Sequence, residues 1–250
     1  MYRTWADFYQ SDAQSVYALW IAPAFFLLYW LLSRPYKRVG VEPRAAWFLN
    51  VYAPLFTIES VADPYVTGPL LRHFGIEGDA ATACMVAFVL IGDFRVFLLL
   101  FYVMAPERGA VRALTRAARW TMVVPLLAVG TLYSLRSRYG ELPSQSIWIL
   151  YELGFVAMAL FLDFAVIPAR FDLRRFEVQQ YLRALVRYVA LYYALWATAD
   201  LLILRRDADW AWALRVIPNQ LYYGFWVPFA YMKFFSPRYA ATRTSVQRSR

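Results

Sequence analysis

The feature that most constrains the fold is a series of long, almost uninterrupted runs of apolar residues. Crossing the hydrocarbon core of a bilayer takes about 20 helical residues. Seven runs reach or approach that length, although prolines interrupt the second and the fourth is short. They cover residues 15–33, 45–71, 80–105, 120–135, 147–168, 181–204 and 210–235. Each must be helical, because backbone polar groups left unpaired in lipid cost several kcal/mol.

The composition agrees with a membrane protein. Of the 250 residues 61% are hydrophobic, whereas soluble chains are about 45–50% apolar, so much of this chain must face lipid. Aromatic residues make up 19%, and Trp and Tyr favour the membrane–water interface. We predict an all-α, polytopic membrane bundle of about seven transmembrane helices. It would form a single domain, residues 1–235, followed by a basic cytoplasmic tail, residues 236–250.

Basic residues between the spans predict the orientation. Sixteen Lys and Arg lie on one side of the predicted membrane and six on the other, and the richer side is cytoplasmic. The N-terminus is then outside and the C-terminus inside, as expected for a protein of the bacterial inner membrane. The sixteen are Arg34, Lys37, Arg38, Arg44, Arg108, Arg112, Arg116, Arg119, Arg170, Arg174, Arg175, Arg183, Arg238, Arg243, Arg248 and Arg250.

Glu59 and Asp63 are the clearest functional candidates among the ionisable residues of the spans. They are four residues apart, so a helix places them on one face. Pro64 and Pro69 follow, and each removes a backbone hydrogen bond from a helix. Transporters place substrate and ion sites at such breaks, so we expect a kinked or broken helix beside two carboxylates. The structural alternative is a proline kink whose acids are satisfied by neighbouring side chains.

Four further charged residues within the spans are candidate relay or gating groups: Asp93, Arg95, Asp163 and Asp200. Asp93 and Arg95 are two residues apart and point in different directions on a helix. Counting the helical rise from the outer ends puts Arg95 and Asp163 at similar depth. Because an unpaired charge is costly there, we expect Arg95 to pair with Asp163 or another intramembrane acid.

Aromatic residues lead to Asp200 along one helix face, because Tyr188, Tyr192, Trp196 and Asp200 are each four residues apart. Such a face can line a ligand pocket, but it more often packs against a neighbouring helix. Arg215, in the last span, is expected to extend to the outer surface.

Three functions fit these patterns. The leading hypothesis is binding or translocation of a small solute or protons through a polar helix-bundle interior, with Glu59 and Asp63 at its centre. The alternatives are an intramembrane enzyme acting on a lipid or isoprenoid, and an accessory subunit of a larger membrane complex that binds lipid, pigment or partner helices. We expect membrane lipids as partners. Dispersed arginines argue against nucleic acid, and a single histidine, His73, argues against a metal site; the cofactor is left open.

Overall fold

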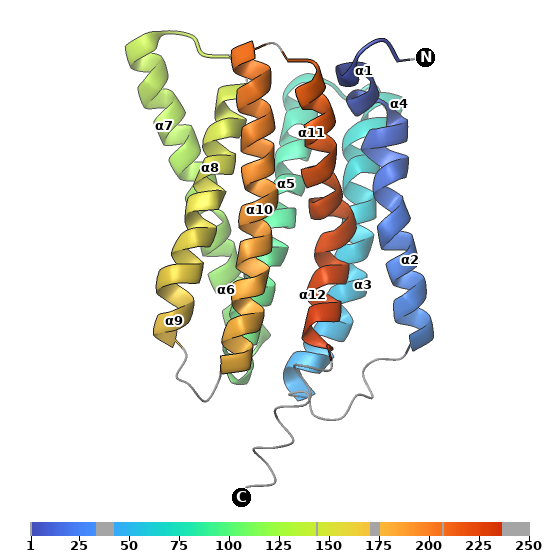
Figure 1. The fold of residues 1–250 in the computed structure, drawn as a ribbon, viewed down its shortest axis with the longest axis vertical. Coiled ribbons are helices and arrows are strands. Elements are labelled where there is room, and N and C mark those ends of the chain that lie inside the picture. The colour runs from blue at the N-terminus through green and yellow to red at the C-terminus, as the bar shows by residue number, and fades with distance from the viewer. Residues whose placement is uncertain (1, 34–42, 144, 171–175, 207, 237–250) are drawn as a thin grey trace, which may run out of the picture. The chain divides into compact units, whose positions relative to one another are not determined.

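A computed structural model describes residues 2–33, 43–143, 145–170, 176–206 and 208–236 (Figure 1). Every regular element within these ranges is a helix, which confirms the all-α class. Five helices in the described residues are long and apolar enough to cross a membrane, as expected of a membrane protein. They are Ala13–Ser33, Gly78–Met104, Ala110–Tyr139, Gln145–Arg170 and Glu177–Arg205.

The predicted second and seventh spans are also helical. Residues 43–73 and 210–234 each form a continuous helical stretch longer than the 21 residues of Ala13–Ser33. Neither is among the five apolar helices. Residues 43–73 carry four charged residues, and residues 210–234 are rich in Trp and Tyr. Each feature lowers the mean hydropathy of the stretch that contains it.

The α-helices are α1 (Trp5–Gln10), α2 (Ala18–Ser33), α3 (Pro43–Tyr65), α4 (Leu71–His73), α5 (Gly78–Met104), α6 (Ala110–Thr121), α7 (Val123–Tyr139), α8 (Gln145–Phe161), α9 (Ile167–Arg170), α10 (Phe176–Arg206), α11 (Trp210–Asn219) and α12 (Trp226–Phe234). Short π-helical segments lie within several of the long stretches, at Ala13–Tyr17, Val66–Leu70, Leu162–Val166 and Gln220–Phe225.

Contacts divide the chain into two compact units. Unit 1 comprises Met1–Tyr17 and Ala118–Tyr222, and unit 2 comprises Ala18–Ala117 and Tyr223–Arg250. Nine of the sixteen basic residues that predict the orientation, and the predicted tail from residue 237 onward, lie outside the described residues.

Unit 2 is organised around α3, which contacts α2, α5 and α12 (Figure 1). The rings of Phe48 and Tyr102 stack with centroids 3.8 Å apart and so join α3 to α5. Trp20 Nε1 donates to the Val61 carbonyl at 2.9 Å, which joins α2 to α3. Side chains of α2 and α5 therefore hold α3, the helix that carries Glu59 and Asp63, in place.

In unit 1, α8 packs against α7 and α10, α10 packs against α11, and α11 packs against the short α1. The α7–α8 contact is close at Gly154, where an added Cβ would lie 2.8 Å from Val124 Cγ1. The aromatic face of α10 is turned toward the last helical stretch, since Trp196 Nε1 donates to Asn219 Oδ1 at 2.8 Å. Tyr188 likewise donates to the Leu221 carbonyl at 3.0 Å. The face leading to Asp200 is thus a packing surface.

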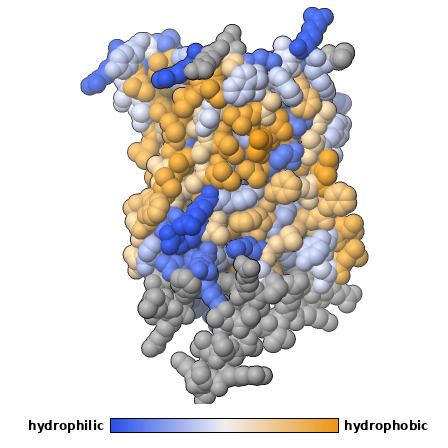
Figure 2. Space-filling view, viewed as in Figure 1, coloured by the Kyte–Doolittle hydropathy of each residue, from blue (hydrophilic) through white to orange (hydrophobic). Residues whose placement is uncertain are grey.

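Large apolar side chains are exposed along the apolar helices. Phe25, Leu32, Leu126, Leu127 and Phe164 are each more than half exposed. Hydrophobic residues make up much of the surface in the face drawn in Figure 2. Exposed apolar surface of this extent is characteristic of contact with membrane or protein partners.

Candidate functional site

The helical stretch that carries Glu59 and Asp63 continues through Pro64 and Pro69. α3 includes Pro54 and Pro64, and the chain then changes to the π-helical turn Val66–Leu70, which contains Pro69. A kinked or broken helix was predicted here; the structure has no break, and the backbone changes from an α-helix to a π-helix after Tyr65. The Thr67 hydroxyl donates to the Asp63 carbonyl at 2.7 Å within this turn. π-helical turns are frequent at functional sites.

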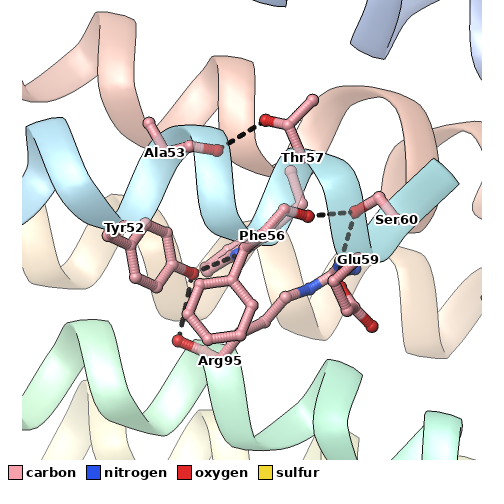
Figure 3. Close-up of polar contacts among 8 residues, drawn as sticks. Tyr52, Ala53, Phe56, Thr57, Glu59, Ser60 and Arg95 are labelled. Atoms are coloured by element: carbon pink, nitrogen blue, oxygen red, sulfur yellow. Dashed lines mark hydrogen bonds and ion pairs between the residues drawn. The ribbon is translucent and has the colours of Figure 1, made fainter. Parts of the chain in front are cut away.

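Glu59 forms an ion pair with Arg95 of α5. Arg95 Nη1 lies 2.6 Å from Glu59 Oε2, with the two side chains 0% and 12% exposed. The same nitrogen donates to the Ser60 hydroxyl, which in turn donates to the Phe56 carbonyl. Figure 3 shows the Arg95 side chain reaching from α5 toward Glu59 and Ser60 on α3. The α3–α5 contact is therefore built around one buried guanidinium.

Two further hydrogen bonds fix the backbone at Arg95. Trp226 Nε1 of α12 donates to the Tyr52 hydroxyl at 3.0 Å. That hydroxyl donates to the Arg95 carbonyl, also at 3.0 Å (Figure 3). Trp226 is 1% exposed and Tyr52 3% exposed, so this chain of bonds is dry. It ties α12, α3 and α5 together at the backbone of Arg95.

Asp63 lies near this pair and makes no ion pair of its own among the described residues, although the Thr67 hydroxyl lies 3.4 Å from its Oδ1. Its residue is 2% exposed, and both Glu59 and Arg95 act on it electrostatically. Its Oδ2 is buried and has no hydrogen-bond partner within the described part of the chain. Asp93 of α5 is 0% exposed as well. Glu59, Asp63 and Arg95 together carry a formal charge of −1 when all three are ionised.

The expectation that Arg95 pairs with an intramembrane acid is confirmed, but Asp163 as that acid is wrong. Asp163 is bound by two arginines of α10: Arg183 Nε lies 2.6 Å and Arg187 Nε 2.8 Å from its two oxygens. The prediction compared only the depth of the residues along their helices. Arg95 and Glu59 lie on contacting helices of unit 2, whereas Asp163 belongs to unit 1.

A second group of buried charges in unit 1 includes Asp200 and two residues that sequence reasoning did not select, Glu152 and Arg215. Arg215 Nη1 lies 2.6 Å from Asp200 Oδ1, so Arg215 does not simply extend to the surface. Its guanidinium also lies over the rings of Tyr9 and Trp212, 5.3 and 5.5 Å from their centroids. Pairing an arginine of the last span with Asp200 required knowledge that α10 packs on α11.

No group of three or more His, Cys, Asp and Glu side chains in the described ranges is arranged to hold a metal ion. An apolar groove of about 340 Å³ lies between α7 and α8, lined by residues that include Leu127, Met158 and Phe161. It contains none of the candidate charges.

No known protein family, curated protein or solved structure matches the sequence.

Proposed function

We propose that the protein binds a proton or a small positively charged solute, and carries it across a membrane, at a site formed by Glu59, Asp63 and Arg95. The observation that carries the proposal is the buried carboxylate of Asp63, which makes no ion pair within the described residues. Arg95 is paired with Glu59 and also acts electrostatically on Asp63, whose Oδ2 is buried with no hydrogen-bond partner among the described residues. An uncompensated charge in a dry site is costly, and a bound proton or cation removes that cost.

The two acids have different roles in this proposal. Glu59 is committed to Arg95 and positions the guanidinium. Asp63, one helical turn away, is the group that loads and releases the proton or solute. The π-helical turn that follows Asp63 gives the backbone a second geometry to adopt during exchange. Asp93 and Asp200 stay candidate relay groups. Asp163, held by two arginines, is better suited to fixing α10.

The proposed topology has seven spans. At 1.5 Å per residue, helical residues 43–73 extend roughly 45 Å and residues 210–234 roughly 37 Å, and both exceed the core thickness of about 30 Å. We place the N-terminus outside and the C-terminus inside, in a bacterial inner membrane, because of the basic loops. A cysteine introduced at the exposed Arg112 of a Cys84→Ala protein should react with an impermeant thiol reagent only from the cytoplasmic side. Labelling from outside would reverse the orientation.

Proton movement can be measured with purified protein in liposomes that contain a pH-sensitive dye, driven by a potassium diffusion potential. Asp63→Asn and Glu59→Gln should each reduce the initial rate at least tenfold while the protein still folds, because an amide keeps the shape but cannot ionise. The matched control is Asp79→Asn, at an exposed acid in the first turn of α5, which should keep the wild-type rate. A full rate in both variants would refute the proposal.

An accessory role in a membrane complex is the second candidate. It is favoured by the ion pairs that Glu59, Asp163 and Asp200 make with arginines, since such pairs can serve packing alone. It predicts a different result in the same experiment. If the acids only hold helices together, Glu59→Gln and Asp63→Asn would lower the yield of folded protein, and wild-type liposomes would show no flux.

A further inference from the structure

We propose a second proton-binding site, located in unit 1, in which Glu152 of α8 holds an exchangeable proton beside the ion pair of Asp200 and Arg215. This site is separate from the Glu59 site and does not depend on the function proposed for it. The inference rests on the arrangement of buried charges and on the polar atoms that this arrangement leaves unmatched.

The three groups come from three packed helices. Asp200 of α10 and Arg215 of α11 are paired at 2.6 Å, and both act electrostatically on Glu152 of α8. Tyr9 of α1 also acts electrostatically on Arg215, whose guanidinium lies over the Tyr9 ring. α7 also packs on α8, but its arginines, at positions 136 and 138, lie in its last turn. Two carboxylates thus face one guanidinium, which gives a formal charge of −1 when all are ionised.

Burial makes that excess charge unfavourable. Glu152 is 4% exposed and Asp200 0% exposed. Glu152 Oε2 and Asp200 Oδ2 are both buried without a hydrogen-bond partner among the described residues. One proton neutralises the group, and it also supplies the donor that a pair of carboxylates lacks. Glu152 Oε2 and Asp200 Oδ2 are therefore the two candidate atoms for the proton.

The proton belongs to Glu152 because Asp200 already makes an ion pair through its Oδ1. Asp200 has the direct contact with the guanidinium, which stabilises its ionised form. Glu152 has no ion pair of its own in the described structure. Arg215, which acts on it electrostatically, is paired with Asp200. A metal cation is a poorer occupant than a proton, because Arg215 would repel it at short range.

Arg215 is the most exposed of the three charged residues. The Arg215 side chain is 19% exposed, and Tyr9 is half-buried on α1. α1 is held over this end of unit 1 by Asp209, whose carboxylate accepts hydrogen bonds from the backbone amides of Trp5 and Ala6 at 2.8 and 3.1 Å. We expect the proton of Glu152 to exchange with water that reaches the partly exposed Arg215.

Infrared spectroscopy of the purified full-length protein tests this directly, because a protonated carboxyl group has a C=O band distinct from that of a carboxylate. The difference between wild type and Glu152→Gln at neutral pH should contain the loss of one protonated-carboxyl band. That band should shift in heavy water and persist in sodium chloride. Asp163→Asn is the control: Asp163 is bound by two arginines, so its difference spectrum should contain the loss of a carboxylate band only.

Asp200→Asn provides a second, opposite test. With Asp200 neutral, Glu152 becomes the counter-ion of Arg215 and should give up its proton, so the same protonated band should disappear although Glu152 is intact. The proposal is overturned if neither variant loses the band, if the band is insensitive to heavy water, or if sodium ions abolish it. It is also overturned if Glu152→Gln fails to fold, because the amide replaces a neutral carboxyl well and a charged one badly.

Discussion

Replacing Arg95 by methionine tests whether the ion pair with Glu59 stabilises unit 2. Methionine fills much of the space of the arginine stem, and the carbonyl of residue 95 still accepts the hydrogen bond from Tyr52. Only the guanidinium is lost. Glu59, 12% exposed and 2.6 Å from that guanidinium, is then an unpaired carboxylate beside Asp63. Breaking a buried pair from one side costs about 3–5 kcal/mol of unfolding free energy.

Removing the second charge should restore part of this loss. Glu59→Gln alone keeps an oxygen that can accept from Arg95, and we expect it to cost about 1 kcal/mol. In the double variant neither charge remains, so its destabilisation should be smaller than the sum of the two single effects by about 1–3 kcal/mol. The measurement is denaturant unfolding in detergent micelles, followed by tryptophan fluorescence, for the wild type and all three variants.

The exposed pair Arg136–Glu141 is the matched control. Its atoms are 3.8 Å apart and its side chains 45% and 91% exposed, so Arg136→Met and Glu141→Gln should each change stability by less than about 0.5 kcal/mol and should add. If the Arg95 and Glu59 effects are also additive, or if Arg95→Met costs no more than Arg136→Met, the buried pair does not stabilise unit 2 and the reasoning fails.

Two further variants test the packing of unit 1. Gly154→Ala places a Cβ 2.8 Å from a methyl group of Val124 and should destabilise the protein by about 1–3 kcal/mol in the same assay. The control Gly130→Ala, whose new Cβ would have nothing within 4 Å, should be neutral or slightly stabilising. Equal effects of the two variants would contradict the close contact at Gly154. Asp209→Ala removes the acceptor of two first-turn amides of α1 and should weaken the attachment of α1 by about 1 kcal/mol. Faster limited proteolysis of the first ten residues would report it, and an unchanged rate would contradict the role of Asp209.

Helix positions were predicted well where apolar runs end at charged residues. The expected span 80–105 corresponds to α5, and 15–33 corresponds to the helix Ala13–Ser33. The fourth span was predicted too short because the stretch before it is rich in arginine. α6 extends the helix back to Ala110, since Arg112, Arg116 and Arg119 lie three or four residues apart around the buried Ala113 and Ala117. A periodic pattern of charge on one face indicates a helix as well as an apolar run does.

The site was predictable only to the extent that it depends on local spacing. The interval of four residues was enough to put Glu59 and Asp63 on one face. The sequence could not identify the partner of Arg95, because that partner depends on which helices pack together. Counting the helical rise gives the depth of a residue in the membrane but not the helices beside it. Arg215 was missed for the same reason, and Glu152 was missed because it stands alone among apolar residues with no ionisable residue one turn away.

The buried charges of the two units follow the same rule. In unit 2 Glu59 and Asp63 face a single guanidinium, and in unit 1 Glu152 and Asp200 do so. One carboxylate of each group makes the ion pair, and the other has none in the described structure. A helix bundle that only had to span a membrane would be at least as stable with an apolar side chain at the second position. What a carboxyl group has and leucine lacks is a proton that can be gained and lost, and both proposed sites use that property.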